Sequence, residues 1–160
     1  MTPTDLAAME CSIARTLDVI GDRWSLLIIR DAFYGVRRFE VFQRDLGVAR
    51  NVLTDRLNKL VDKGVLERRR YEDRPPRYEY RLTDRGRDLV GVVLVMMRWG
   101  DRWTGTGDAP VSVTHTTCGQ KTKPVVSCSE CGDELRLGEL LADPIPVPRV
   151  ASPGQLDPVA

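Results

Sequence analysis

Apolar residues recur at every third or fourth position in four segments of the chain, which is the pattern of helices that bury one face. These segments span residues 12–20, 24–33, 39–46 and 50–63. The second segment is apolar on most of its surface, so we expect it to form the central helix of the domain. Ser12 is a suitable N-cap for the first helix. Gly47 provides a tight turn after the third helix, and Gly64 caps the fourth.

Two further segments, residues 65–71 and 77–82, alternate Val, Leu and Tyr with charged residues, as strands with one solvated face do. Residues 72–76 join them into a hairpin with an Arg-Pro-Pro tip. Thr83 is a good N-cap for a last helix, which we expect to run to about Trp103. This helix is apolar on all sides, which is unusual for a helix that lies alone at a protein surface.

A short helix, a glycine turn and a longer amphipathic helix have the spacing of a helix-turn-helix, and the following hairpin adds a wing. A short strand is expected at residues 36–38. We therefore predict a mainly α (α+β) fold, a winged helix-turn-helix with a dimerisation helix and a small C-terminal zinc-ribbon-like module. The predicted domains are residues 1–104 for the winged helix, 105–143 for the Cys/His module and 144–160 for a disordered tail with five prolines in seventeen residues.

Charge is distributed unevenly along the chain. The whole chain holds 24 Lys+Arg and 23 Asp+Glu, a net charge of +1, which by itself would not indicate a nucleic-acid binder. Residues 50–87, however, hold twelve Lys/Arg against seven Asp/Glu, a local charge of +5. Residues 108–160 carry −3 and residues 1–10 carry −2. The basic segment coincides with the fourth helix and the hairpin. It could form a surface that binds nucleic acid, or it could simply be a well-solvated surface.

A helix in this position can enter the major groove of a DNA duplex, where short polar side chains reach base edges and basic side chains reach phosphates. Asparagine and threonine on its outward face suit base or sugar contacts. The wing tip, stiffened by two prolines, could reach the backbone or the adjacent minor groove. The predicted contacts to double-stranded DNA are Arg50, Asn51, Thr54, Arg56, Asn58, Lys59, Arg74 and Arg77.

Several motifs resemble those of the HxlR-type winged-helix transcription regulators, in one order and at family-like spacing. They are Cys11-Ser-Ile-Ala-Arg-Thr-Leu-Asp-Val-Ile-Gly-Asp-Arg-Trp24, Arg38-Phe39, Leu53-Thr54 with Leu57, and Pro75-Pro76-Arg-Tyr-Glu79-Tyr80-Arg-Leu82-Thr83 with Gly86. The resemblance spans residues 11–103 and implies a homodimer, paired through the first and last helices, that binds a palindromic operator, often as a repressor. Ala49 departs from it, because such helices often begin with a Ser or Thr cap. The segment beyond Trp103 also lies outside the minimal family pattern.

The resemblance also marks Cys11 as a redox-sensing candidate, because some family members sense oxidants or electrophiles through a cysteine at the start of this helix. A helix N-terminus favours the reactive thiolate form. The alternative is a small buried core residue, which is what most single cysteines are.

Four residues near the C-terminus have the spacing of metal ligands. They form two knuckles, His115-x2-Cys118-Gly119 and Cys128-x2-Cys131-Gly132. One histidine and three cysteines match the tetrahedral preference of zinc without recruiting Cys11, so we expect one structural zinc per chain. A redox dithiol at Cys128 and Cys131, a disulfide between the knuckles, or knuckles that only pack are the alternatives.

No enzyme motif competes with these interpretations. The sequence has no phosphate-binding glycine loop and no nucleophile elbow, and its single histidine leaves Ser-His or Cys-His catalysis nearly without a base. The longest uncharged apolar stretch, residues 89–97, falls short of the roughly 20 residues that span a membrane, and no secretory signal is recognisable, so a cytoplasmic location is expected.

The leading hypothesis is a homodimeric, sequence-specific DNA-binding transcriptional regulator whose activity could respond to a redox or ligand signal. Residues 1–104 would then form its DNA-binding and dimerisation domain. The alternative is a winged-helix interaction module that recruits a protein partner through its Cys/His ribbon.

Overall fold

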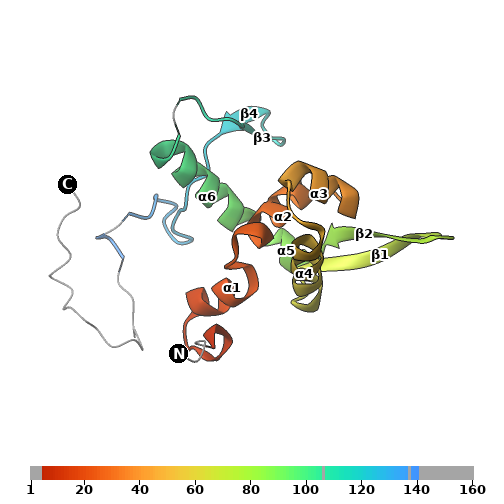
Figure 1. Cartoon of the computed structure of the whole chain (residues 1–160). Helices are drawn as coiled ribbons and strands as arrows, with labels where there is room; N and C mark the ends of the chain where they lie inside the picture. The colour runs from red at the N-terminus through yellow and green to blue at the C-terminus, as the bar shows by residue number, and fades with distance from the viewer. Residues whose placement is uncertain (1–4, 106, 137, 141–160) are drawn as a thin grey trace. The chain divides into compact units, whose positions relative to one another are not determined.

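A computed structural model of the chain (Figure 1) describes residues 5–105, 107–136 and 138–140. Its elements are η1 (Leu6–Ala8), α1 (Ser12–Ile20), α2 (Arg23–Phe33), α3 (Phe39–Leu46), α4 (Arg50–Asp62), β1 (Leu66–Asp73), β2 (Pro76–Leu82), α5 (Asp84–Arg87), α6 (Val90–Trp103), β3 (Val113–His115) and β4 (Gln120–Thr122). The chain divides into two compact units, Met1–Val125 and Val126–Ala160. The tail predicted at 144–160 lies outside the described residues.

The first four helices lie within one residue of the predicted segments, and a local cap marks the start of α2 and the end of α3. Cys11, and not Ser12 as predicted, is the N-cap residue of α1. The Asp22 carboxylate caps α2 by accepting the backbone N–H groups of Trp24 and Ser25 at 3.1 and 3.0 Å. Gly47 ends α3 with φ 61°, a left-handed conformation that favours glycine.

The sequence predicts one helix from Thr83 to Trp103, but the chain forms two, α5 and α6. The Thr83 hydroxyl does cap α5 by accepting the Gly86 N–H at 3.1 Å. The Leu89 N–H then donates to the Gly86 carbonyl oxygen, three residues back instead of four, so the turn tightens and the α-helix stops. Gly86 itself lies so close to the Val65 carbonyl that a Cβ on Gly86 would stand 2.2 Å from that oxygen. This tertiary contact fixes α5 against the start of the wing.

The wing is the antiparallel hairpin of β1 and β2, which pairs Leu66 with Leu82 at its base and Asp73 with Pro76 at its tip. Figure 1 shows that the hairpin extends away from the helices. The strand expected at 36–38 is reduced to one bridge, between Arg38 and Glu79. The wing base is therefore anchored to the segment that enters α3.

The core forms where α2, α3 and α4 meet the base of the wing. Its fully buried side chains include Ile28, Ile29, Phe42, Leu53, Leu57, Leu60 and Leu66. Three of them, at positions 53, 57 and 60, follow helical spacing along α4 and turn one face of that helix inward. The opposite face of α4 is consequently held at the surface.

Candidate nucleic-acid interface

The outward face of α4 carries short polar side chains. Asn51, Thr54 and Asn58 are exposed there. The Thr54 hydroxyl donates to the Arg50 carbonyl oxygen at 2.9 Å, which keeps this side chain close to the helix backbone. Side chains of this length and polarity can reach base edges when a helix lies in the major groove. The structure thus presents three of the predicted contact residues on one face, and their contact with DNA stays a prediction.

The start of α4 leaves its backbone donors open. The helix begins at Arg50 with Ala49 as the N-cap, so the Ala49 departure does not move the helix start. No side-chain cap satisfies the first-turn N–H groups of α4. Unsatisfied N–H groups at a helix N-terminus, together with the helix dipole, favour a negatively charged partner such as a phosphate.

Arg56 faces inward more than the sequence suggests. Its Nε lies 3.5 Å from Asp22 Oδ1, and the side chain is about one-third exposed. Partial burial raises the pKa of the Asp22 carboxyl, but hydrogen bonds from Ser25, the charge of Arg56 and a hydrogen bond from Trp24 outweigh it and hold the pKa below its ordinary value. The Arg56 and Asp22 pair therefore joins α4 to the start of α2, and contact of Arg56 with DNA stays a prediction.

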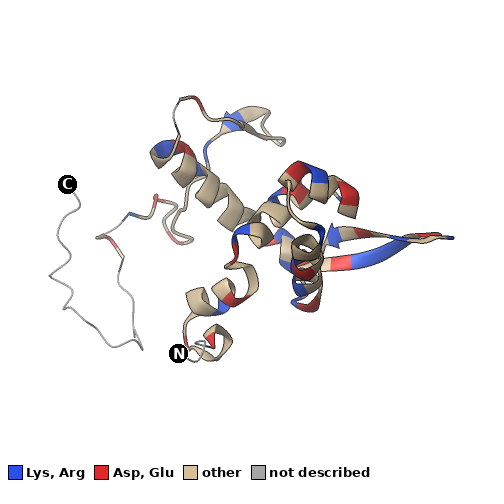
Figure 2. Ribbon diagram, in the orientation of Figure 1, with Lys and Arg blue, Asp and Glu red and all other residues tan. Residues whose placement is uncertain are grey.

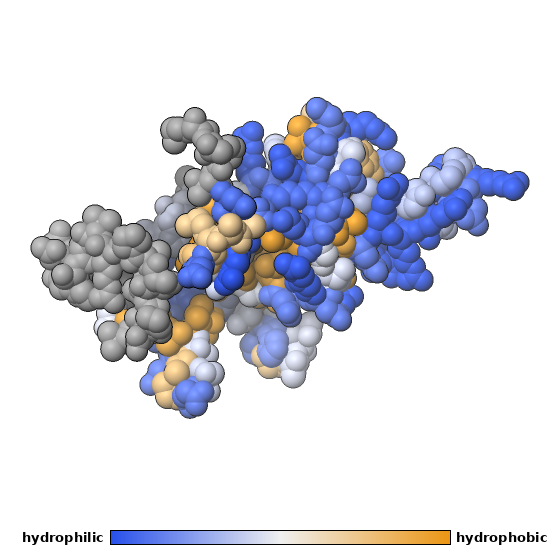
Figure 3. All heavy atoms as spheres, turned by 90° about the horizontal axis from the view of Figure 1, so that it is seen from below, coloured by the Kyte–Doolittle hydropathy of each residue, from blue (hydrophilic) through white to orange (hydrophobic). Residues whose placement is uncertain are grey.

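Basic side chains line the wing. Figure 2 shows Lys and Arg along β1 and β2, and in Figure 3 the projecting wing is almost wholly hydrophilic on the visible face. At the tip, Arg70 Nη2 donates to the Asp73 carbonyl oxygen at 2.8 Å, and Arg77 Nε lies 3.2 Å from Glu72 Oε2. Arg74 is exposed between them. The wing thus has an ordered tip that presents a guanidinium group to solvent.

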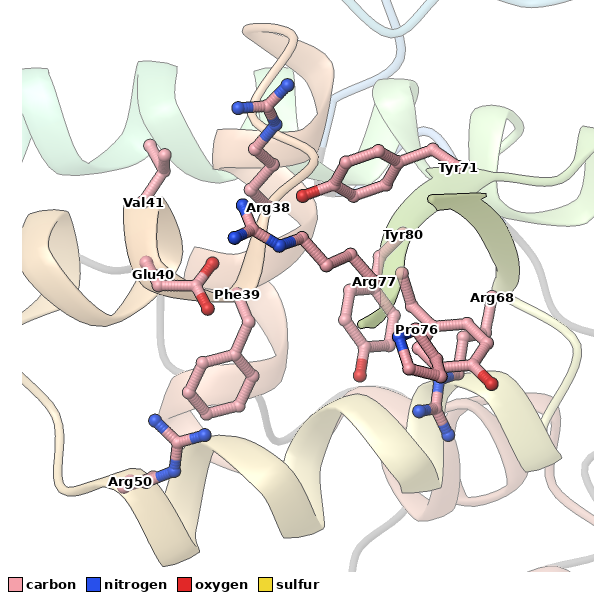
Figure 4. Close-up of a pocket in the computed structure, with 11 residues that line it drawn as sticks. Arg38, Phe39, Glu40, Val41, Arg50, Arg68, Tyr71, Pro76, Arg77 and Tyr80 are labelled. Atoms are coloured by element: carbon pink, nitrogen blue, oxygen red, sulfur yellow. The ribbon is translucent and has the colours of Figure 1, made fainter. Parts of the chain in front are cut away.

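Between α4 and the wing lies a cleft of about 700 Å³, and Figure 4 shows the side chains around it. Four arginines line it: Arg38 before α3, Arg50 at the start of α4, Arg68 on β1 and Arg77 on β2. Glu40 is the acidic residue of the lining. Burial raises the pKa of Tyr80, another lining residue, so its phenol stays neutral. The cleft is therefore strongly cationic.

Three of these arginines are stacked on aromatic rings. The guanidinium carbon lies 5.0 Å from the Tyr71 ring centre for Arg38, 4.8 Å from Phe39 for Arg50, and 3.8 Å from Tyr78 for Arg68. Stacking restrains the side chain but leaves the in-plane N–H donors free to bind phosphate oxygens. The arrangement is thus suited to contact a phosphodiester backbone.

The sequence interpretation did not include Arg38 and Arg68 among the contact residues. Arg68 stands in a run of three arginines, from which periodicity cannot select the one that faces α4. Arg38 precedes a helix, and only the bridge to Glu79 brings it beside the wing. The Arg38-Phe39 pair of the family-like motif was the signal that could have found it.

An uncovered apolar stripe runs along α6. No residue of α6 is buried, although the helix is rich in Val, Met and Trp. Residues at helical spacing are exposed on it: Val92, Val95, Met96, Trp99 and Trp103. On α1, Ile13 and Leu17 are exposed as well, Ile13 by 72%. Large exposed apolar surfaces of this kind are typical of protein interfaces.

The cysteines are all free thiols, and Cys11 is partly exposed at the N-cap of α1. In the first knuckle, His115 Nδ1 and Cys118 Sγ lie 3.4 Å apart, and the Gly119 N–H donates to the His115 carbonyl oxygen at 2.8 Å. In the second, the Gly132 N–H donates to the Cys128 carbonyl oxygen at 2.9 Å. Both knuckles therefore close with the same type of turn.

Hydrogen bonds from the backbone N–H groups of Cys131 and Glu130, and from the Cys131 thiol, lower the pKa of the Cys128 thiol. Within the described ranges, no group of three or more His, Cys, Asp or Glu side chains is gathered to hold a metal ion. The structure thus brings the predicted ligands together in pairs, His115 with Cys118 and Cys128 with Cys131.

In the part of the chain that the structure describes, no helix is both long enough and apolar enough to cross a membrane.

The sequence profile of one protein family, described as HxlR-like helix-turn-helix, matches residues 19–108, which contain α2 to α6. An uncharacterized HTH-type transcriptional regulator of Mycobacterium tuberculosis is 42% identical over 136 residues, covering 84% of this chain and 86% of the relative. Another, from Synechocystis, is 36% identical over 94 residues, covering 58% of this chain and 70% of the relative. Because the mycobacterial match covers 84% of this 160-residue chain, it must continue past residue 108, where the family profile ends, into the Cys/His segment.

Solved structures agree with these relatives. The crystal structure of PA1607, described as a candidate transcription factor, is similar with a TM-score of 0.79 at 36% identity, covering 89% of this chain and 100% of PA1607. The redox regulator HypR in its reduced form has a TM-score of 0.55 at 35% identity, covering 57% of this chain and 92% of HypR. These similarities confirm the predicted winged helix-turn-helix. The chain therefore belongs to the HxlR-like helix-turn-helix family of DNA-binding transcriptional regulators, not to a family of enzymes.

Proposed function

We propose that the protein is a sequence-specific repressor that binds a palindromic operator as a homodimer. The observation that carries the proposal is the juxtaposition of two surfaces: the exposed polar face of α4 and the arginine-lined cleft beside it. A surface that reads bases next to one that binds phosphates is what sequence-specific recognition of a duplex requires. Because the target is chromosomal DNA, the proposed location is the cytoplasm.

In this proposal Asn51, Thr54 and Asn58 contact base edges or sugars in the major groove. Phosphates are contacted by basic side chains, namely Arg50, Arg56 and Lys59 of α4 and Arg74 and Arg77 of the wing. Arg74 at the exposed tip reaches the flanking backbone or minor groove. The uncapped N-terminus of α4 adds backbone donors toward one phosphate.

The homodimer is proposed to pair through α1 and α6. The support is the exposed apolar stripe of α6, in which Trp99 and Trp103 are 60% and 64% exposed. Aromatic side chains are enriched in the centres of protein interfaces, and a second copy of the same stripe would cover them isologously. Two copies would present two α4 helices, which is why a palindromic operator is expected.

The test of the proposal is recovery of bound fragments. Purified full-length protein is mixed with sheared DNA of the genome that encodes it, and the retained fragments are sequenced. The proposal predicts an enriched inverted repeat whose half-sites lie about one helical turn, roughly 10 bp, or a multiple of it apart. In transcription assays the protein should lower initiation from promoters that overlap this repeat. Fragments retained without a shared motif would contradict sequence-specific binding and favour a protein-recruiting role.

We further propose that Cys11 makes DNA binding responsive to electrophiles. The support is its partly exposed thiol at the N-cap of α1, a helix that is proposed to pair in the dimer, and the similarity to the redox regulator HypR. With N-ethylmaleimide, the Cys11 thiolate adds to the alkene carbon, and the neighbouring carbon takes up a proton. Full modification should weaken operator binding in the wild type and leave Cys11→Ser unaffected. Unchanged binding with Cys11 fully modified would refute the proposal.

One structural zinc ion per chain is also proposed, with His115, Cys118, Cys128 and Cys131 as ligands. The support is the chemistry of the residues and the geometry inside each knuckle. Each knuckle offers two ligand side chains at the two-residue spacing of zinc knuckles. Each is followed by a glycine in the left-handed region, Gly119 with φ 70° and Gly132 with φ 81°. Zinc would hold the module together and take no part in a reaction.

A further inference from the structure

A second cleft lies within the Met1–Val125 unit, between the C-terminal half of α6 and the segment that carries β3 and β4. Its volume is about 590 Å³, which is within the range of small-molecule sites. Met97 and Arg102 line it from α6, and Val113 and Lys121 line it from β3 and β4. It shares no lining residue with the arginine cleft beside α4.

The hydrogen bond between Arg98 and Pro124 holds this cleft in shape. Arg98 Nη1, on α6, donates to the Pro124 carbonyl oxygen at 2.8 Å. The strands β3 and β4 pair in an antiparallel ladder, in which Val113 is opposite Thr122. The wall opposite α6 is therefore an ordered hairpin, and the chain that follows it is tied to the helix by this hydrogen bond.

Apolar side chains form the inner part of the lining. Met97, Val113 and Pro124 are partly buried, and Val111 is exposed at the cleft. Ligand sites combine an apolar lining of this kind with a small number of polar groups that orient the ligand. The inner part of the cleft would accept a ring or a short hydrocarbon chain.

Cations outnumber anions around this apolar lining. The charged lining residues are Arg98, Arg102, Lys121 and Lys123 against Asp101 and Asp108. Residues 108–160 carry a net charge of −3, yet two of their four basic side chains, Lys121 and Lys123, stand at this cleft. A local excess of positive charge next to apolar surface is complementary to an organic anion.

We propose that the cleft binds a small amphipathic organic anion, a carboxylate or sulfonate carried on an apolar ring or chain. The apolar part lies against Met97 and Val113, and the anionic group lies toward Lys121 and Lys123. Because α6 also carries the apolar stripe that is proposed to form the dimer interface, the ligand would act on pairing or DNA binding. Only that last step rests on the proposed function.

The test uses a pair of fluorescent probes that share one ring system. 8-Anilino-1-naphthalenesulfonate carries a sulfonate, and N-phenyl-1-naphthylamine is its neutral counterpart. Full-length wild type, a Lys121→Gln/Lys123→Gln variant and an Arg44→Gln/Arg69→Gln variant are titrated with each probe. Arg44 and Arg69 are exposed and line no part of this cleft, so the last variant controls for lost charge. Duplex binding of each variant is measured in parallel.

The proposal predicts saturable binding of the sulfonate probe and a roughly tenfold weaker affinity in the lysine variant, as expected for loss of charge-assisted hydrogen bonds. The neutral probe should lose no affinity in that variant and should bind more weakly to Val113→Ser. An equal loss of sulfonate-probe affinity in the arginine control would overturn the proposal, and so would sulfonate-probe affinity that is unchanged in the lysine variant. Retained duplex binding in the lysine variant shows that either result concerns this cleft and not the DNA interface.

Discussion

The guanidinium carbon of Arg50 lies 4.8 Å from the centre of the Phe39 ring, so the first residue of α4 stacks on the first residue of α3. The two helices of the helix-turn-helix are thereby joined at the point where α4 would meet DNA. Stacking limits the rotamers of Arg50, so less side-chain entropy is lost when its donors bind a phosphate. The contact links the packing of the domain to its proposed recognition of DNA.

Arg50→Gln should weaken binding to all duplexes and reduce the slope of log affinity against log salt by about 1, because one phosphate contact is lost. Phe39→Leu keeps the charge and removes only the stack, so affinity should fall by about 0.5–1 kcal/mol with the salt slope unchanged. Fluorescence anisotropy with operator and scrambled duplexes measures both. A change of sequence preference in Arg50→Gln would assign Arg50 to base reading instead.

Trp99→Ala should raise the dissociation constant of the homodimer by about tenfold or more, because a buried aromatic anchor contributes more than 1 kcal/mol to an interface. Sedimentation equilibrium measures this change. Tyr34→Ala is the matched control, since Tyr34 is an aromatic residue that is 61% exposed and lies outside α1 and α6. A monomeric wild type, or equal weakening by Tyr34→Ala, would contradict pairing through α6.

Gly86→Ala should destabilise the fold by about 2 kcal/mol, because the new Cβ would stand 2.2 Å from the Val65 carbonyl oxygen. Gly91→Ala serves as the control. Among the described residues, no atom outside the neighbouring backbone of α6 lies within 4 Å of a Cβ built at Gly91, so alanine there should stabilise α6 by about 0.5–1 kcal/mol. Urea denaturation followed by circular dichroism gives both free energies of unfolding. A neutral Gly86→Ala would mean that α5 can move away from the wing.

Protein purified without a metal-binding tag should contain about one zinc ion per chain, as the set of four ligands requires. Cys128→Ser should lose the metal, whereas Cys11→Ser, which removes a cysteine outside the ligand set, should retain it. Elemental analysis by plasma mass spectrometry measures the stoichiometry. Metal-free wild type with an unchanged circular dichroism spectrum after chelation would contradict the zinc proposal.

Much of the fold could be predicted from sequence because its signals are local. The apolar positions at 53, 57 and 60 give α4 its inward face, and glycines such as Gly47 end the helices. The division between α5 and α6 could not be predicted, because it depends on the contact of Gly86 with Val65, far earlier in the chain. Periodicity reports the apolar face of a segment but not a tertiary contact that interrupts it.

In the candidate interface, too, the local features could be predicted from sequence and the tertiary contacts could not. Residues on α4 could be identified because outward positions follow from helical spacing. The cleft arginines Arg38 and Arg68 could not be identified from sequence, because their positions depend on strand pairing and on stacking against Tyr71 and Tyr78. Arg56 was predicted only as a DNA contact, and its pair with Asp22, which joins it to the start of α2, could not be read from spacing. Spacing alone does not distinguish a surface cation from one that stabilises the fold.

In the proposed mode of binding, the polar face of α4 reads sequence while the basic wing binds phosphates. The most direct measurement is affinity for an operator duplex and a scrambled duplex across a salt series, for wild type, Asn51→Ala and Arg74→Ala. Wild-type affinity should fall with a log-log slope near −0.9 per phosphate contact. Asn51→Ala should bring the two duplexes closer together in affinity, and Arg74→Ala should weaken both alike and make the slope shallower by about 1. Duplex affinity that does not change with salt would contradict this mode of binding. An equal loss of affinity for the operator and scrambled duplexes in Asn51→Ala, as in Arg74→Ala, would also contradict it.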